Sequence, residues 1–217
     1  MGGEVPKQYH TLDGKMVIEH SLGRLLAHPR IERVYVALSS DDRWWDGCQY
    51  AGHAEVMRVE GGSERGHSVL NALCRIREEA GPDDWVLVHD AARPCLRSTD
   101  IDRLIDELAD HPVGGILAGR LSDTVKREGP TGVIGETLAR EHLWRAFTPQ
   151  MFRLGLLHQS LGAALQAGRP VTDEASAIEL HGLNPRLVEG HSDNIKITHP
   201  QDLELARFYL QQQQVGA

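Results

Sequence analysis

Hydrophobic residues recur along the chain in two alternating patterns, one typical of strands and one typical of helices. Short runs of large apolar residues predict buried strands at 34–38, 55–59, 85–88 and 115–118. Apolar residues at helical spacing predict helices over 19–27, 63–76 and 99–108. We interpret Ser63 as the N-cap of the second helix, and Thr99 with Asp102 as a capping box at the start of the third.

The second half of the chain has a more varied pattern. Helical spacing predicts further helices over 152–165, 173–180 and 202–210, and short apolar runs predict strands at 186–188 and 195–197. The segment 123–140 alternates short β-like pieces around a Gly-Pro-Thr-Gly turn and has few apolar residues, so we predict a hairpin arm that projects from the body. The glutamines at 211–214 predict a frayed tail.

The order of these elements predicts an α/β fold with a mostly parallel sheet in a single domain over 1–217. Right-handed crossovers place helices on both faces of such a sheet, which gives three layers. A nucleotide-binding α/β fold usually begins with a central strand and a glycine-rich turn, whereas the first element here is a helix preceded by a polar loop. We therefore expect a first strand and a glycine-rich loop to be missing upstream.

Composition narrows the classes of function. Hydrophobic residues make up 41% and charged residues 25% of the 217 positions, as in ordinary globular proteins, and no apolar run approaches the ~20 residues of a membrane span. A net charge of -8 without a basic cluster argues against sequence-independent nucleic-acid binding. Cys48, Cys74 and Cys95 form no CxxC pair, and with no secretory signal they predict a reduced, cytoplasmic protein.

The segment HDAARP at 89–94 is the strongest candidate for chemistry, because it directly follows the strand predicted at 85–88. Ligands of open α/β sheets bind outside the carboxyl ends of the strands. Asp90 can hold Mg²⁺ or a ribose hydroxyl, Ala91 lets a ligand approach the backbone, and Arg93 can reach a phosphate. The competing interpretation is a capped turn with a structural Asp90–Arg93 pair.

Two weaker signals accompany this segment. Gly62 and Ser63 lie between a strand and a helix, where free N–H groups suit an anion or the edge of a base, but an ordinary turn fits equally well. Lys7, Arg140 and Lys196 are isolated cations. Their spacing alone favours solvated surface charges over ligand contacts.

Several segments together resemble the 2-C-methyl-D-erythritol 4-phosphate cytidylyltransferase family. They are PKQY at 6–9, GGSER at 61–65, VHDAARP at 88–94, DTVKR at 123–127, TPQ at 148–150, TDEASA at 172–177 and DNIK at 193–196. GGSER alone is loose, whereas VHDAARP, TDEASA and DNIK together are specific, and the likeness covers the whole chain in family order. The resemblance implies a Rossmann-like nucleotidyltransferase fold. It also implies transfer of CMP from CTP to 2-C-methyl-D-erythritol 4-phosphate, with Mg²⁺, giving 4-diphosphocytidyl-2-C-methyl-D-erythritol and pyrophosphate.

The resemblance also implies roles for individual residues. The catalytic cations it implies are Lys7, Arg140 and Lys196. The nucleotide-binding residues it implies are Gly62, Ser63, Ser68, Asp90, Ala91 and Arg93, with Asp90 also as the metal ligand. The residues it implies for the acceptor substrate are Thr124, Arg140, Asp193 and Lys196.

The resemblance further implies a homodimer in which residues 120–147 form an exchanged arm, so that Thr124 and Arg140 serve the partner's site. At the start of the chain, only Met1-Gly2-Gly3 match the end of the family's glycine-rich segment. Two other interpretations stay open. One is a ribitol 5-phosphate cytidylyltransferase, which would share the CTP residues and differ in the acceptor pocket, and the other is a truncated fragment that dimerises without activity. Neither a nucleic acid nor a membrane is expected as a partner.

Overall fold

The computed structural model describes residues 5–215, so Met1-Gly2-Gly3 lie outside the described residues. The α-helices are α1 (Val17–Leu26), α2 (Arg65–Ile76), α3 (Ser98–Leu108), α4 (Leu154–Gln166), α5 (Glu174–Leu180) and α6 (Gln201–Val215). The strands are β1 (Thr11–Leu12), β2 (Lys15–Met16), β3 (Val34–Leu38), β4 (Val56–Glu60), β5 (Trp85–Val88), β6 (Gly114–Arg120), β7 (Val125–Glu128), β8 (Ile134–Leu138), β9 (Trp144–Arg153) and β10 (Arg186–Glu189). Short 3₁₀ turns are η1 (Lys7–Tyr9), η2 (Trp45–Gly47), η3 (Pro130–Gly132) and η4 (Arg140–His142). No helix within this described stretch is both long and apolar enough to cross a bilayer.

The main sheet has four strands in the order β10-β6-β9-β5. Strand β10 runs parallel to β6, whereas β9 runs antiparallel to both β6 and β5. Three of the four strands therefore point the same way, as predicted for a mostly parallel sheet, and β9 is the antiparallel exception. Strands β3 and β4 form a separate parallel pair.

Strand β9 has no counterpart among the elements predicted from the sequence, which place the start of a helix at Phe152. The register of β9 passes from Gln150 opposite Ile116 to Ala146 opposite Ala118, which is a bulge in β9. Pro149 lies in this bulge, where its missing N–H removes no ladder hydrogen bond. The interrupted pattern hides the strand, and the helix begins only at α4.

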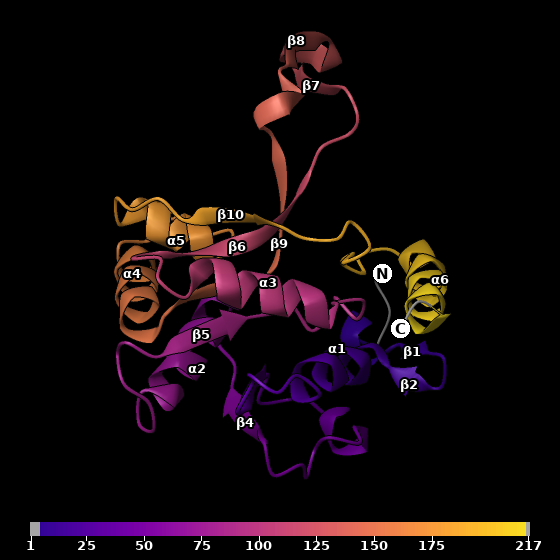
Figure 1. Ribbon diagram of the computed structural model, residues 1–217, viewed down its shortest axis with the longest axis vertical. Helices are drawn as coiled ribbons and strands as arrows, with labels where there is room; N and C mark the ends of the chain where they lie inside the picture. Colours follow the sequence, from indigo (N-terminus) through magenta and orange to yellow (C-terminus); the bar gives the residue numbers. More distant parts are fainter. Residues whose placement is uncertain (1–4, 216–217) are drawn as a thin grey trace.

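Helices cover both faces of the four-stranded sheet (Figure 1). Ile116 and Phe152 pack against one face with residues of α2, α4 and α5. Leu117 and Met151, their neighbours along the strands, pack on the opposite face with residues of α3. This alternation follows the pleat of a strand, and it produces the three layers expected of the α/β fold.

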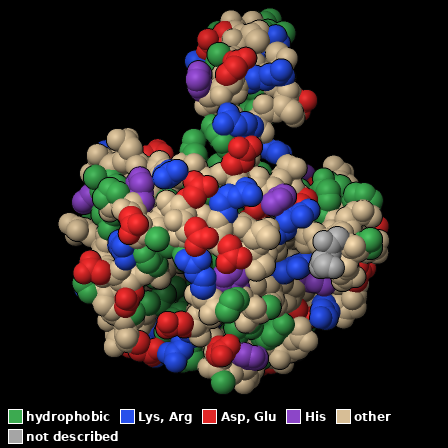
Figure 2. All heavy atoms as spheres, in the orientation of Figure 1, with side chains coloured by type: hydrophobic (Ala, Val, Ile, Leu, Met, Phe, Trp, Pro, Cys, Tyr) green, Lys and Arg blue, Asp and Glu red, His purple; other side chains and the backbone are tan. Residues whose placement is uncertain are grey.

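The hairpin β7–β8 projects from the ends of β6 and β9 (Figure 1), and in Figure 2 it stands off the body on a narrow neck. Val133 and Ile134 are exposed near its tip. The projecting part is shorter than the predicted arm over 120–147, because Trp144 already pairs with β6 and Phe147 is buried in the core.

Both ends of the described chain are more ordered than the sequence indicates. A turn at Asp13 and Gly14, both with positive φ, joins the hairpin strands β1 and β2, which were not predicted. Helix α6 continues to Val215, so the prediction of a frayed tail is wrong. Gln213 on this extension donates from Nε2 to the carbonyl oxygen of Cys95 at 2.9 Å.

The segment 195–197 forms no strand, in contrast to the prediction. Its alternating pattern buries Ile197, but the backbone N–H of Ile197 donates to the carbonyl oxygen of Ala92 at 2.8 Å instead of joining a sheet ladder. This segment is therefore an extended loop that lies against the turn after β5.

Two predicted helix caps are also wrong. Helix α2 has the extended residue Glu64 as its N-cap, so Ser63 lies outside the helix. Helix α3 has Arg97 as its N-cap, two residues before Thr99, where the predicted capping box begins. Neither N-cap side chain makes a capping hydrogen bond.

Candidate functional site

Asp90 lies just beyond the carboxyl end of β5 at the centre of a cluster of cations. Its Oδ2 atom is 3.0 Å from Nζ of Lys196 and 3.3 Å from Nε of Arg93. Its Oδ1 atom is 3.3 Å from Nε of Arg65, at the start of α2. Three segments that are distant in the sequence therefore meet at one carboxylate.

The cations control the protonation of this carboxylate. Burial alone would raise the pKa of Asp90, but Lys196 and Arg65 overcome that effect and hold the pKa well below its ordinary value. Burial lowers the pKa of Lys7, and the nearby charge of Lys196 lowers it further against the opposing effect of Asp90. Lys7 thus lies within electrostatic reach of the same cluster.

Arg65 connects the cluster to the TDEASA segment. Its Nη1 and Nη2 atoms donate to Oε1 and Oε2 of Glu174 at 2.6 and 2.8 Å, and the Glu174 side chain is only 1% exposed. Four cations face two carboxylates in this region, which leaves an excess of two positive charges. Such a local excess suits a ligand with several negative charges.

Arg65 and Glu174 are not among the predicted site residues, although both lie within the motifs. The signal that points to them is complementary charge, since GGSER ends in a cation and TDEASA contains a carboxylate beside its first helical turn. Charge alone does not identify the pairing, because the two residues are 109 positions apart.

The GGSER loop closes tightly on the start of α2. The backbone N–H of Gly62 donates to Oγ of Ser68 at 2.9 Å, and that hydroxyl donates to the carbonyl oxygen of Glu64 at 3.1 Å. A Cβ atom on Gly62 would lie 2.3 Å from Cβ of His67, so only glycine fits there. Ser63 is exposed beside this turn.

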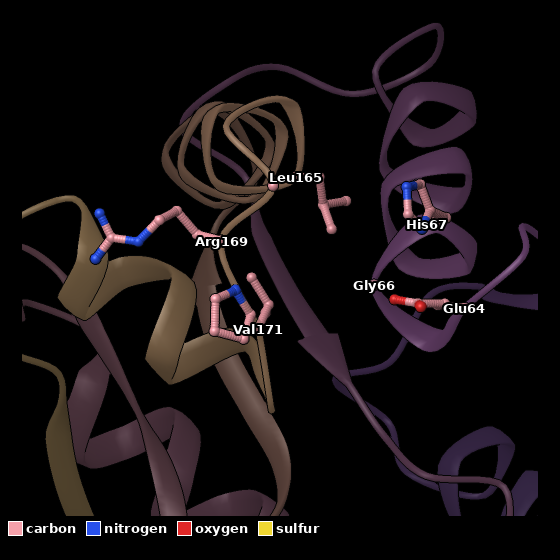
Figure 3. A pocket seen from close by; sticks show the side chains of 8 residues that line it. Glu64, Gly66, His67, Leu165, Arg169 and Val171 are labelled. Atoms are coloured by element: carbon pink, nitrogen blue, oxygen red, sulfur yellow. The ribbon is translucent and has the colours of Figure 1, made fainter.

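Two hollows border the predicted motifs. One of about 420 Å³ lies beside the segment that carries Lys7, at the carboxyl end of β3, and its lining includes Gln8, Asp42 and Trp44. The other, of about 410 Å³, separates the start of α2 from the connection between α4 and α5 (Figure 3). In Figure 3 the Arg169 side chain extends away from this second hollow. Residues on either side of Lys7 line the first hollow and residues on either side of Arg65 line the second, so each hollow borders a residue of the cation cluster.

Not every predicted residue joins the cluster. Asp193 is buried and pairs through Oδ2 with Nη2 of Arg97 at 2.6 Å and with Nε2 of Gln213 at 3.0 Å. Thr124 and Arg140 are exposed on the projecting arm, where Arg140 donates to the carbonyl oxygen of Ser122. The carbonyl oxygen of Ala91 accepts a hydrogen bond from Oγ of Ser21 at 2.8 Å.

Asp90 is the predicted ligand for Mg²⁺. Among residues 5–215, no group of three or more His, Cys, Asp or Glu side chains is placed to hold a metal ion. Mg²⁺ is often held by one or two carboxylates together with substrate phosphates and water. Asp90 fits a site of that kind and does not belong to an all-protein metal cage.

Comparison with known proteins shows the family to which the chain is similar. A sequence model of 2-C-methyl-D-erythritol 4-phosphate cytidylyltransferase matches residues 1–212. The enzyme of that name from Pseudomonas fluorescens (strain SBW25) is 52% identical over 209 residues, which cover 96% of this chain and 89% of the relative. The corresponding protein of Hahella chejuensis is 51% identical over 210 residues, covering 97% of this chain and 87% of the relative.

Solved structures give the same result. A crystal structure of 4-diphosphocytidyl-2C-methyl-D-erythritol synthase superposes with a TM-score of 0.85 at 40% identity and covers 94% of each chain. The Francisella tularensis 2-C-methyl-D-erythritol 4-phosphate cytidylyltransferase superposes with a TM-score of 0.83 at 39% identity, covering 95% of this chain and 94% of that one. With its cation cluster, its α/β layers and matches over nearly its whole length, the chain belongs to the 2-C-methyl-D-erythritol 4-phosphate cytidylyltransferase family.

Proposed function

We propose that this chain transfers the CMP group of CTP to 2-C-methyl-D-erythritol 4-phosphate and releases pyrophosphate. The observation that carries the proposal is the meeting of Lys7, Arg93 and Lys196 around Asp90, in a family whose members bear the name of this activity. An oxygen of the acceptor phosphate attacks the α-phosphorus of CTP, and the bond from that phosphorus to the bridging oxygen of the β-phosphate breaks. The acceptor phosphate is already ionised near neutral pH, so the reaction needs no general base.

The chemical task of the protein is to bring two polyanions together and to offset their repulsion. We assign Lys7 and Arg93 to the triphosphate and Lys196 to the phosphate of the acceptor. The closed loop of Gly62, Ser63 and Ser68, with Ala91 near the ribose, is assigned to the nucleoside. Asp193 is assigned a supporting role at the acceptor, because its loop carries Lys196 while its own carboxylate binds elsewhere.

Asp90 has two roles in this proposal. It keeps Lys196 extended toward the cluster through the 3.0 Å ion pair, and it is the protein ligand assigned to Mg²⁺. When bound, the ion supplies positive charge that neutralises the triphosphate. Since Arg65 and Arg93 also contact Asp90, the carboxylate stays fixed whichever of its partners a substrate engages.

We also propose that the chain is one catalytic domain whose arm, predicted over 120–147, is exchanged in a homodimer. A two-stranded hairpin is marginally stable alone, and Val133 and Ile134 are exposed near its tip. Thr124 and Arg140 would then reach the acceptor in the partner's site. All three cysteines are free, which fits a reducing, cytoplasmic compartment.

Pyrophosphate release from CTP tests the reaction itself. With 2-C-methyl-D-erythritol 4-phosphate as the acceptor we expect stoichiometric pyrophosphate and product, and with ribitol 5-phosphate we expect none. Turnover that prefers ribitol 5-phosphate would reassign the acceptor, and release without any acceptor would indicate simple CTP hydrolysis.

Mixed dimers test the exchanged arm. An Arg140→Ala subunit carries an intact Lys196, and a Lys196→Ala subunit carries an intact Arg140, so a heterodimer regains one complete site. Random mixing should recover about a quarter of the wild-type sites, since half of the dimers are mixed and each has one good site of two. Mixed subunits that stay as inactive as their parents after verified exchange would place Arg140 in its own chain's site.

A further inference from the structure

The imidazole of His89 lies between the turn after β5 and strand β9. Its Nε2 atom is 3.1 Å from the carbonyl oxygen of Arg93, and its Nδ1 atom is 3.0 Å from Oγ1 of Thr148. That Thr148 oxygen also accepts the backbone N–H of Asp90 at 3.1 Å. The partly buried ring therefore contacts the end of the turn at Arg93 directly, and it reaches the start of the turn at Asp90 through Thr148.

The partners of this ring determine where its proton lies. The carbonyl oxygen of Arg93 can only accept, so Nε2 must carry the hydrogen. In a ring with a single hydrogen Nδ1 then accepts, and the hydroxyl of Thr148, 3.0 Å away, is placed to donate to it. The resulting series of hydrogen bonds runs from the N–H of Asp90 to Oγ1 of Thr148, from that hydroxyl to Nδ1 of His89, and from Nε2 of His89 to the carbonyl oxygen of Arg93. Each donor in this series has one acceptor.

We infer that His89 is a positioning residue. Its imidazole, with Nε2–H donating to the carbonyl oxygen of Arg93, fixes Asp90 and Arg93 relative to β9 and thereby the place where Arg93 meets the nucleotide. The inference rests on the function proposed above. It extends that function to a residue that does not itself reach the cation cluster.

The surroundings of the ring support this role. Within the turn, the N–H of Arg93 donates to the carbonyl oxygen of Asp90 at 3.0 Å, and Nη1 of Arg93 donates to the carbonyl oxygen of Asn194 at 2.8 Å. These bonds hold the guanidinium only if the backbone of Arg93 stays in place, and His89 is the side chain that holds that backbone.

Two substitutions separate the hydrogen bond at Nε2 of His89 from the one at Nδ1. His89→Asn keeps an acceptor near the position of Nδ1 for Thr148 and removes the donor to Arg93. His89→Gln keeps a donor near the position of Nε2 for Arg93 and removes the acceptor for Thr148. We expect His89→Asn to raise KM for CTP about tenfold, the effect of one lost hydrogen bond, and His89→Gln to raise it by less than threefold.

The matched control is His28, a buried histidine whose Nε2 lies 3.1 Å from Oδ1 of Asp102, outside the cluster. His28→Gln should lower stability and leave KM for both substrates at the wild-type value. The KM for 2-C-methyl-D-erythritol 4-phosphate should change little in either His89 variant. Equal increases in KM for CTP in the Asn and Gln variants, or equal increases for both substrates, would show that His89 serves only the stability of the fold.

A second measurement does not depend on turnover. In ¹⁵N-labelled protein at a fixed pH above neutrality, the side chain of His89 should show the Nε2–H tautomer. An Nδ1–H tautomer would overturn the inference even if the enzyme is active. Conversely, a wild-type protein that makes no product would refute the proposed function while this tautomer is still observed.

Discussion

Replacement of Arg65 by methionine should destabilise the fold far more than neutralisation of its partner Glu174. The two side chains form a bidentate ion pair in which Glu174 is 1% exposed and Arg65 is 36% exposed. Loss of Arg65 leaves a buried carboxylate without a cation. Loss of the charge on Glu174 leaves a guanidinium that still contacts Asp90 and reaches water.

The magnitudes follow from this asymmetry. Breaking a buried ion pair by removing one partner costs about 3–5 kcal/mol, and the partial exposure of Arg65 places Arg65→Met near the low end, at about 3 kcal/mol. Glu174→Gln retains an acceptor oxygen, so it should cost about 1 kcal/mol. The double variant Arg65→Met/Glu174→Leu removes both charges and should lie within about 1 kcal/mol of the wild type.

Urea unfolding at pH 7 and at one fixed protein concentration measures these differences. For a chain of this length, 3 kcal/mol corresponds to a fall in Tm of about 6–12 °C. Arg186→Met is the matched control, because its pair with Glu107 is exposed on both sides and worth less than about 1 kcal/mol. Equal costs for the two single variants, or a double variant that is as unstable as Arg65→Met alone, would refute the reasoning.

Three further predictions concern single positions. Lys7→Ala should lower kcat for pyrophosphate release at least ~100-fold, the scale for losing one charge-stabilising donor, and a near-wild-type kcat would remove Lys7 from the catalytic cations. Gly62→Ala should lower the free energy of unfolding by about 1–3 kcal/mol, because the new Cβ meets His67 at 2.3 Å, whereas the control Gly52→Ala, with nothing within 4 Å, should stay within about 0.5 kcal/mol. In the native protein one thiol per chain, that of Cys74, should react with a thiol reagent, because burial raises the pKa of the other two; a second fast thiol would contradict their burial.

The strands at 34–38 and 85–88 could be predicted because a buried strand is a continuous apolar run that needs no other information. Strand β9 could not be predicted, because the bulge around Pro149 interrupts the alternation of apolar residues although the strand continues on both sides of it. At 195–197 the alternation is real, since Ile197 is buried, but burial without a neighbouring strand makes an extended loop.

In the site, too, some residues could be predicted from the sequence and others could not. The position after β5 identified Asp90 and Arg93, because the location of ligands in α/β sheets is a property of the fold class. The resemblance supplied Lys7 and Lys196, whose spacing alone favoured ordinary surface charges. Contacts between motifs, such as the pair of Arg65 with a carboxylate 109 positions away, depend on how the layers pack, and no local pattern encodes them.

The excess of two positive charges around Asp90 has a consequence for the ligand-free protein. Without a bound polyanion these like charges repel one another, and the repulsion lowers the free energy of unfolding. Salt screens charges that are more than ~10 Å apart, so the net charge of -8 on the chain as a whole relieves little of this local repulsion. Any small anion that occupies the site acts as a stabiliser by mass action, by about 1.4 kcal/mol at ten times its dissociation constant. In an anion-poor buffer, the Lys7→Ala variant should then be more stable than the wild type although its kcat is at least ~100-fold lower, which would mean that activity at this site is retained at the expense of stability.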